Sequence, residues 1–284
     1  MQRCRARRTG RRSGIDPRGV TPPSGAGRLW DRVVATSNRL GERLLKLIDR
    51  MIARQSIIPN QPFFEPSEFP WVRDVEENWK TIRAELDQVL AHRDALPNFQ
   101  DISTDQASIT DDDRWKTYFF YGYGFRSDPN CARCPETTRL IDRIPGMQTA
   151  MFSILAPRKR IPPHDGPYKG VLRYHLGLLV PEPEEQVGIK VGGQVAHWHE
   201  GKSLVFDDTF EHEVWNDTDE TRVVLFLDVV RPLREPMRTV NAIVIKAIGY
   251  SPFIQDAKRR HEDWERRFAL EGGGAEPTRQ EGTR

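Results

Sequence analysis

The histidines are the residues whose spacing most directly suggests chemistry. Five of the seven fall between residues 164 and 212. His164, His175 and His212 come from three separate segments of that region, so a fold that joins these segments would gather several imidazoles at one site. Imidazole is a common ligand for zinc, copper and iron. These three histidines are the strongest candidates for a metal-binding or catalytic role.

Two arginines interrupt segments that are otherwise apolar. In VLRYHLGLLV, strand alternation places Arg173 and His175 on one face. Arg222 opens the segment RVVLFLDVV and shares a face with apolar side chains. A buried guanidinium is unfavourable unless an anion meets it. The anion is either an anionic ligand or, for Arg173, an internal carboxylate from Asp207, Asp208 or Glu211.

The other histidines carry weaker signals. His197 and His199 flank Trp198, and strand geometry would put both imidazoles on one face, where they could bind a metal. No third ligand lies nearby in the sequence, and the Glu-Gly-Lys that follows is typical of a hairpin turn, so a structural role is favoured. We expect His92 and His261, on charged helical stretches, to lie at the surface.

Cys131 and Cys134 form a C-x-x-C pair in a predicted loop. Half a zinc site and a redox pair are the functional alternatives. The sequence offers no second C-x-x-C and no nearby histidine pair to complete a zinc site, so an incidental loop pair is favoured. Three cysteines cannot form a disulfide framework, and no signal-peptide core follows the N-terminus. These features favour a cytoplasmic protein.

The stretch HDGPYKGVLRYHLGL, the stretch WHEGKSLVFDDTFEHEVWND and the arginine that follows resemble the aspartyl/asparaginyl β-hydroxylase family of Fe(II)/2-oxoglutarate dioxygenases. The resemblance covers about residues 57–235 and is densest over 149–232. The segment CPETTRLIDRIPGMQTAMF also resembles the lipid A acyl-chain hydroxylases within that family. The matching positions are Ser153, His164, Gly166, Arg173, His175, His212 and Arg222.

The resemblance implies that His164 and His212 bind Fe(II) and are the catalytic metal ligands. A carboxylate usually completes such a two-histidine site, and it would stand at the position that Gly166 occupies here. Either water or Asp165 would then fill the third position. In an extended segment the side chain of residue 165 points away from that of residue 164, so water is favoured.

The resemblance also implies how 2-oxoglutarate and the substrate are held. Arg222 would form a two-pronged ion pair with the distal carboxylate of 2-oxoglutarate, and Ser153 would add a hydroxyl donor. His175 would donate to the carboxylate nearer the metal. Arg173 would lie on the substrate side and hold a substrate carboxylate. The cofactor and cosubstrates are therefore expected to be Fe(II), 2-oxoglutarate and O₂.

The implied reaction is β-hydroxylation of an aspartyl or asparaginyl substrate, free or in a peptide, with decarboxylation of 2-oxoglutarate to succinate and CO₂. One alternative is hydroxylation of a lipid A-type acyl chain, with peripheral membrane contact through the basic amphipathic segment 30–54 and the apolar segment 240–254. Another is a cupin-like binding or sensor protein that holds metal too weakly for turnover. The partner is a small molecule, a peptide or a lipid, and not a nucleic acid.

The segments that must position these residues are short and β-rich. From Trp115 to Asp228 apolar residues alternate in runs broken by Pro and Gly, which is typical of an all-β sandwich or barrel. With the resemblance, the expected fold is mainly β: a double-stranded β-helix (a cupin-like jelly roll) with flanking helices. The expected strands are 116–122, 149–156, 171–180, 187–191, 194–199, 203–206 and 222–230, and the expected helices are 72–92, 136–144, 237–248 and 254–270.

Charge and composition define the ends of the chain. Of 284 residues, 37% are hydrophobic and 30% charged, and no apolar run approaches the ~20 residues of a membrane span. Residues 1–28 hold eight Arg and one Asp, so an overall charge of +2 leaves −5 on the remainder, which disfavours a nucleic-acid binder. The predicted organisation is a disordered basic tail (1–28), an amphipathic helix (29–56), a dioxygenase domain (57–235), C-terminal helices (236–270) and a disordered end (271–284).

Overall fold

The computed structural model describes residues 46–270. The chain divides into two compact units, Met1–Ile48 and Asp49–Arg284. Both sheets and the candidate site belong to the second unit. The predicted tails 1–28 and 271–284, and the first part of the predicted helix 29–56, lie outside the described residues. Residues 46–55, at the end of that predicted helix, are helical.

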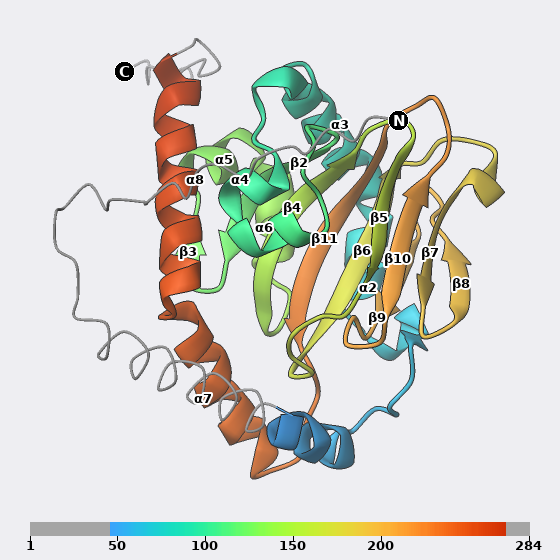
Figure 1. The fold of residues 1–284 in the computed structure, drawn as a ribbon, viewed down its shortest axis with the longest axis vertical. Coiled ribbons are helices and arrows are strands. Elements are labelled where there is room, and N and C mark those ends of the chain that lie inside the picture. The colour runs from blue at the N-terminus through green and yellow to red at the C-terminus, as the bar shows by residue number, and fades with distance from the viewer. Residues whose placement is uncertain (1–45, 271–284) are drawn as a thin grey trace, which may run out of the picture. The chain divides into compact units, whose positions relative to one another are not determined.

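Two antiparallel sheets face each other and form the predicted jelly roll (Figure 1). The larger sheet has the strand order β1-β9-β6-β11-β4-β2-β3, and the smaller sheet the order β5-β10-β7-β8. Non-consecutive strands are neighbours in both sheets, as expected for a double-stranded β-helix. The strands are β1 (Phe63–Phe64), β2 (Trp115–Gly122), β3 (Phe125–Arg126), β4 (Met147–Leu155), β5 (Lys159–His164), β6 (Val171–Leu179), β7 (Val187–Val191), β8 (Gln194–His197), β9 (Ser203–Phe206), β10 (His212–Asn216) and β11 (Arg222–Val230).

The pairing of β11 aligns the predicted site residues of the larger sheet. Phe226 of β11 lies opposite His175 of β6, and Val224 lies opposite Ser153 of β4. Side chains alternate between the two faces of a strand, so Arg222, two positions from Val224, shares their face. Arg173 of β6 lies opposite Asp228 on that same face. The sequence prediction that Arg173 and His175 share one face is therefore confirmed, and the strand pairing places Ser153 and Arg222 on that face as well.

Two strands of the smaller sheet were not predicted, and they carry the two predicted metal ligands. His164 ends β5 and His212 begins β10, and neither residue lies in an expected strand. Pro162 and Pro163 hide β5 in the sequence because proline cannot donate to a ladder. It is tolerated here because β5 is an edge strand of its sheet. Only five residues form β10, too few for a clear alternating pattern.

Helices cover one side of the larger sheet, and α3 packs against both β6 and α6 (Figure 1). The predicted helix 72–92 is two helices, because Asn78 adopts a non-helical conformation and its side chain donates to the backbone oxygen of Asp74. None of the helices within residues 46–270 is long and apolar enough to span a bilayer. The α-helices are α2 (Val72–Glu77), α3 (Trp79–Leu90), α4 (Phe99–Ile102), α5 (Asp128–Arg133), α6 (Pro135–Ile141), α7 (Met237–Gly249) and α8 (Pro252–Leu270).

The prediction that His261 lies at the surface is wrong. Its side chain is buried on α8, in contact with the rings of Phe119, Phe125 and Trp264. The many charged residues of α8 lie on its other faces, so the average composition of the helix concealed its buried stripe.

Candidate active site

His164 and His212 lie side by side on neighbouring strands. They are directly paired in the β5–β10 ladder, and their ring centroids are 4.1 Å apart. The Nδ1 atom of His164 lies 2.9 Å from the backbone oxygen of Pro162, and the Nδ1 atom of His212 lies 3.0 Å from that of Phe210. A carbonyl oxygen can only accept, so each Nδ1 donates. Each ring is therefore protonated at Nδ1, and its Nε2 atom has a free lone pair with which it can bind a metal.

Burial also keeps both imidazoles neutral. Desolvation, with a contribution from the nearby Arg173 charge, lowers the pKa of His164 below its usual value. Desolvation and then the neighbouring His164 lower the pKa of His212 to about 3. Both rings are therefore unprotonated at neutral pH and available as ligands. Within residues 46–270, no cluster of three or more His, Cys, Asp or Glu side chains has an arrangement suited to a metal.

Arg222 is a buried cation without a counter-charge among residues 46–270. Its side chain is 2% exposed, and its Nε and Nη1 atoms have no hydrogen-bond partner in this part of the chain. The guanidinium lies over the ring of Trp198, 4.5 Å from the ring centre. Desolvation lowers the pKa of Arg222 to about 9, so it is still protonated at neutral pH. An unpaired charge in such a place is unfavourable until an anion reaches it.

His175 and Ser153 lie on the same sheet face as Arg222. Both ring nitrogens of His175 are buried without a partner among the described residues, and its ring lies 5.8 Å from that of Trp198. The hydroxyl of Ser153 accepts a 3.0 Å hydrogen bond from Trp115 Nε1, which leaves its own hydrogen free to donate. The structure therefore brings together the three residues predicted to hold 2-oxoglutarate. Trp198 was not predicted as a site residue, because its contacts with Arg222 and His175 join segments that are far apart in the sequence.

Arg173, by contrast, is neutralised from within the protein. Its Nη2 atom forms a 2.8 Å ion pair with Asp208, and its Nε atom donates 3.0 Å to Asp228. Desolvation works to lower the pKa of Arg173, but the attraction of the two carboxylates outweighs it and raises the pKa. Asp208 is one of the three carboxylates that the sequence offered as partners for Arg173, and Asp228 is a partner that the sequence did not indicate. The predicted hold of Arg173 on a substrate carboxylate stays a prediction.

Asp208 occupies the space that a side chain at position 166 would need. A Cβ atom added to Gly166 would lie 2.4 Å from Asp208 Cγ, and the Gly166 backbone N–H donates 2.7 Å to the Asp208 backbone oxygen. Desolvation raises the pKa of Asp208, and its Oδ1 atom has no partner among the described residues. The sequence did not single out Asp208 as a carboxylate beside the two histidines. Its adjacency to Gly166 was hidden because the two residues are far apart in the chain.

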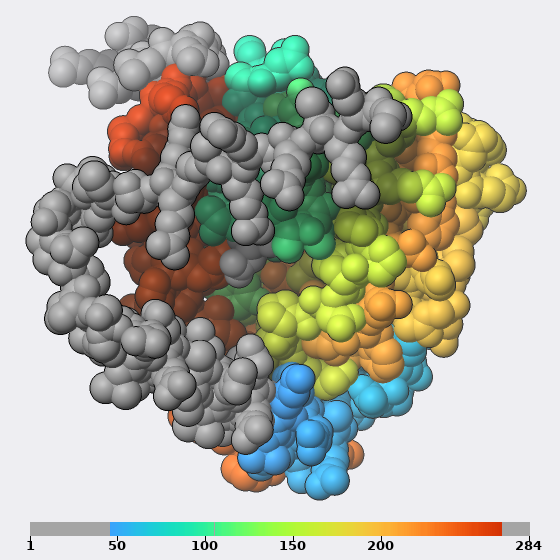
Figure 2. Space-filling model, in the orientation of Figure 1, coloured from blue at the N-terminus to red at the C-terminus, as the bar shows by residue number. Residues whose placement is uncertain are grey.

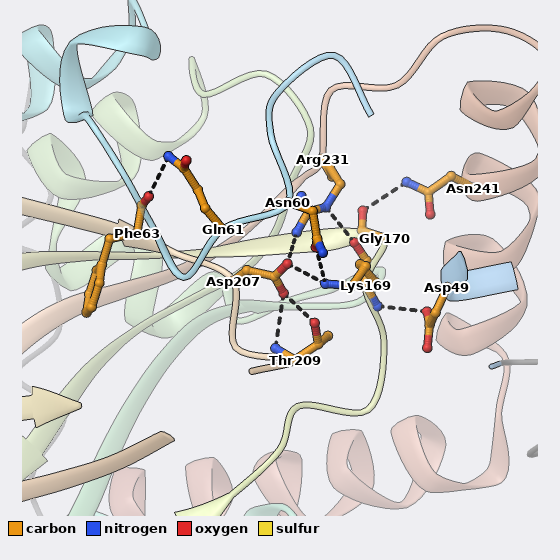
Figure 3. Close-up of polar contacts among 10 residues, drawn as sticks. All are labelled: Asp49, Asn60, Gln61, Phe63, Lys169, Gly170, Asp207, Thr209, Arg231 and Asn241. Carbon is orange, nitrogen blue, oxygen red and sulfur yellow. Dashed lines mark hydrogen bonds and ion pairs between the residues drawn. The ribbon is translucent and has the colours of Figure 1, made fainter. Parts of the chain in front are cut away.

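The neighbouring Asp207 links the turn that follows His164 to the turn that precedes His212 (Figure 3). Its fully buried carboxylate forms ion pairs with Arg231 and, at 2.6 Å, with Lys169, which follows His164 in the chain. The same carboxylate accepts hydrogen bonds from the backbone and the hydroxyl of Thr209, which precedes His212. Arg231 also donates 2.8 Å to the backbone oxygen of Lys169. This cluster fixes the two turns relative to each other.

A cavity of about 370 Å³ reaches the two histidines. Arg173, Asp165 and Asp208 line it near the histidines, and most of the remaining wall is apolar. On β11 the cavity is lined by Phe226 and Asp228 but does not extend to Arg222; Ser153 and His175 are likewise outside it. The apolar wall is formed by Phe99, Ile102, Ile109, Trp115, Phe119, Phe125, Met151, Phe253, Ile254 and Ala257.

The weaker candidates lie outside this site. His197 donates from Nδ1 to the backbone oxygen of Val187, and His199 is exposed, 3.5 Å from Glu184. Cys131 and Cys134 are both buried and both free thiols. They lie in and directly after α5, where the sequence analysis placed a loop.

The chain is similar in sequence to several known hydroxylases. A family model described as aspartyl/asparaginyl beta-hydroxylase matches residues 76–232. The ornithine lipid ester-linked acyl 2-hydroxylase of Rhizobium tropici is 45% identical over 256 residues, which cover 89% of this chain and 87% of that protein. The human aspartyl/asparaginyl beta-hydroxylase is 32% identical over 186 residues, or 63% of this chain, and the matched part is only 24% of the human protein. Among solved structures, a cupin 2 conserved barrel domain protein from Salinispora arenicola aligns with 49% of this chain and 92% of its own, at 13% identity and a TM-score of 0.28.

Proposed function

This chain belongs to the aspartyl/asparaginyl β-hydroxylase family, and we propose that it uses Fe(II) and 2-oxoglutarate to hydroxylate an ester-linked acyl chain of an ornithine-type lipid. The buried, unpaired guanidinium of Arg222 is the observation that carries the cosubstrate assignment. The apolar cavity beside the histidine pair supports the acyl-chain substrate. Hydroxylation itself is the activity of the named relatives.

His164 and His212 would hold the iron through their Nε2 atoms. Their Nδ1–H groups donate to backbone carbonyls, which orients the rings and fixes the tautomer before metal arrives. Bound Fe(II), with 2-oxoglutarate and O₂, would supply the oxidising power to convert an unactivated C–H bond to C–OH while 2-oxoglutarate becomes succinate and CO₂. The protein supplies the positions of these groups and the exclusion of water.

Arg222 would bind the distal carboxylate of 2-oxoglutarate. The cation is desolvated, lies against Trp198 and has no ion pair within residues 46–270, so a dicarboxylate would supply the missing counter-charge. Ser153 and the partnerless nitrogens of His175 lie on the same face and offer further hydrogen bonds. A charge-assisted hydrogen bond of this kind is worth roughly 1.5–3 kcal/mol.

The cavity favours an acyl chain over an aspartyl side chain. Its volume of about 370 Å³ lies within the usual range for small-molecule sites, and each methylene buried along its wall would contribute about 0.8 kcal/mol. Arg173, the cation nearest the histidines, already pairs with Asp208 and Asp228, so it offers little free charge to a substrate carboxylate. The relative named for acyl 2-hydroxylation also matches far more of this chain than the human aspartyl/asparaginyl hydroxylase does.

The test is to incubate the full chain with Fe(II), 2-oxoglutarate and O₂ and to offer either a detergent-solubilised ornithine lipid or a pool of aspartyl and asparaginyl peptides. We expect stoichiometric succinate and a +16 Da acyl product from the lipid. The His164→Ala and His212→Ala variants should lose both products. His199→Ala is the matched control, because His199 is exposed and outside the cavity.

Three outcomes would contradict parts of the proposal. Hydroxylated peptide without hydroxylated lipid would restore the aspartyl or asparaginyl substrate. Loss of activity in His199→Ala equal to that in His212→Ala would overturn the ligand assignment. Absence of succinate with either substrate would favour the binding or sensor alternative.

A further inference from the structure

The exposed large apolar side chains of this protein are concentrated next to α7. Ile243 is 63% exposed and Tyr250, at the end of α7, is 73% exposed. Met51 is 45% exposed and Ile57 is 57% exposed in the segment that follows the start of the second unit. Among the described residues of that unit, Val195 on β8 is the one other exposed side chain of this class. Grouped exposed apolar residues mark interaction sites more often than scattered ones do.

Residues 50–57 and α7 are held close to each other. Leu233, shortly before α7, forms a β-bridge with Ser56, and the backbone N–H of Arg234 donates 3.0 Å to the Gln55 oxygen. Figure 1 shows the helical residues 49–55, in blue, beside α7, in orange. The corresponding colours meet at the lower edge of the space-filling view in Figure 2. We name the exposed parts of residues 50–57 and of residues 237–250 the docking surface.

The docking surface has a net positive charge, although Arg238 forms a 2.7 Å ion pair with Glu235, just before α7. Residues 50–57 contain Arg50 and Arg54, both exposed, and no acidic residue. Residues 237–250 contain Arg238 and Lys246, also exposed, and again no acidic residue. A helix with exposed apolar side chains and flanking Lys or Arg is suited to the interface of an anionic bilayer. A protein partner would need an acidic and apolar face, whereas a bilayer supplies both properties.

The docking surface continues into the wall of the active-site cavity. α8 begins two residues after Tyr250, and its residues Phe253 and Ile254 line that cavity. A side chain at Gly249 would meet the backbone oxygen of Tyr123, another residue that lines the cavity. A lipid held at this surface would therefore have its acyl chains near the cavity wall.

Asp49, next to the first segment, and Asn241 of the second segment hold the turn that follows His164 (Figure 3). Asp49 accepts a 3.0 Å hydrogen bond from the Lys169 backbone, and Asn241 of α7 donates 2.9 Å to the Gly170 oxygen. Tyr168, which lines the cavity, donates 2.5 Å to the Asn241 side chain. The docking surface is thus hydrogen-bonded, through α7 and through Asp49 beside its first segment, to the residues that follow His164, a predicted metal ligand.

We propose that residues 50–57 and 237–250 dock this protein onto the surface of an anionic lipid bilayer, from which the acyl substrate enters the cavity. This inference rests on the proposed acyl-chain function for the entering substrate, but the docking itself does not depend on catalysis. The proposed docking surface overlaps both segments that the sequence analysis named for membrane contact, 30–54 and 240–254. Residues 30–45 of the first segment lie outside the described part of the chain.

The test is co-sedimentation of the full chain with vesicles of phosphatidylcholine, with or without phosphatidylglycerol. We expect binding to the phosphatidylglycerol vesicles, reduced by added salt, and at least tenfold weaker binding by Ile243→Asp and Tyr250→Asp. Val195→Asp is the matched control, because it places the same charge at an exposed apolar residue on β8 and should bind as wild type does. All three substituted side chains are exposed in the wild-type protein, and circular dichroism of each variant verifies the fold.

Activity measurements separate the docking from the proposed function. Ile243→Asp should hydroxylate detergent-solubilised lipid at the wild-type rate and vesicle-embedded lipid much more slowly. If the variants lose vesicle binding, the docking is supported. If the wild-type protein at the same time hydroxylates no lipid, the proposed function is contradicted. Equal vesicle binding by Ile243→Asp, Tyr250→Asp and wild type would overturn the docking. A dimer in size-exclusion chromatography that these substitutions dissociate, without vesicle binding by wild type, would assign the surface to a second copy of the chain instead.

Discussion

Arg173 and Arg222 lie on one sheet face but have opposite electrostatic surroundings. Two buried carboxylates neutralise Arg173, whereas Arg222 has no ion pair within residues 46–270. Removing one member of a buried ion pair is strongly destabilising, because it leaves the other charge buried without a partner. Removing a buried charge that has no partner leaves no such charge behind. The two side chains should therefore respond differently to the same substitution.

We expect Arg222→Met to raise the apparent KM for 2-oxoglutarate at least tenfold, or about 1.4 kcal/mol, without loss of stability. Arg173→Met should lower the free energy of unfolding by roughly 3 kcal/mol or more, because it leaves Asp208 and Asp228 as buried, unpaired neighbours. Urea denaturation and succinate kinetics measure the two effects. Equal destabilisation by both substitutions would mean that Arg222 has an internal counter-charge after all.

Gly166 is the second residue whose substitution is informative. Its absent side chain leaves room for the Asp208 carboxylate, so Gly166→Ala should destabilise the protein by about 1–3 kcal/mol through overpacking. In an Asp208→Ala background the same substitution should have little effect, which a double-mutant cycle would show. Gly166→Asp should not tighten Fe(II) binding while Asp208 is present, because the two carboxylates would compete for one space. Additive effects of the two substitutions would contradict this account.

Among the structural elements, the turns after β5 and β9 have the strongest internal link. Asp207 joins Lys169, Arg231 and Thr209, and so sets where His164 and His212 stand relative to each other. The link uses a fully buried carboxylate, for which a neutral isostere is a poor replacement. Asp207 acts through the two histidines and is a positioning residue.

Asp207→Asn should lower the free energy of unfolding by about 3–5 kcal/mol and weaken Fe(II) binding in the fraction that remains folded. Asp219→Asn is the control, because Asp219 pairs with Arg158 at the surface, where ion pairs contribute little. Fe(II) titration in the absence of denaturant measures the metal affinity, and urea denaturation measures the free energy of unfolding. A destabilised variant with unchanged Fe(II) affinity would show that Asp207 has no positioning role.

For the molecule as a whole, the buried histidines link stability to pH. Desolvation lowers the pKa of His164, His175 and His212 in the native state. The unfolded chain therefore takes up protons near pH 6.5 that the native protein does not. The histidine contribution to stability is complete above pH 6.5 and is lost as the pH falls through the native pKa, about 3 for His212.

Urea denaturation of the metal-free protein between pH 7 and pH 5 should show stability falling with pH. A single histidine contributes at most about 1.4 kcal/mol per pH unit to the slope. His212→Gln should have a shallower slope than wild type. Asp208 and Asp228, whose pKa values burial raises, oppose the trend at lower pH in both proteins, so the comparison isolates the histidine. Parallel curves would contradict a lowered His212 pKa.

The amino-acid sequence determined those features that depend on neighbouring residues. Alternation along one strand was enough to put Arg173 with His175, and Arg222 with the apolar residues of β11. The resemblance of the motif residues to a known family implied the jelly roll. The shared faces follow from the local geometry of an extended chain, in which every second side chain points to the same side.

Only the tertiary structure decided which distant residues meet. The pairing of His164 with His212, the approach of Asp208 to Gly166 and the cover of Trp198 over Arg222 each join segments tens of residues apart. The sequence analysis did not predict β5 or β10, because prolines and short length hide strands whose stability comes from their neighbours in the sheet. Charge balance behaves in the same way: the sequence offered Arg173 either an internal carboxylate or a ligand, and only the packing of the folded chain brings Asp208 and Asp228 to it and leaves Arg222 without an ion pair among residues 46–270.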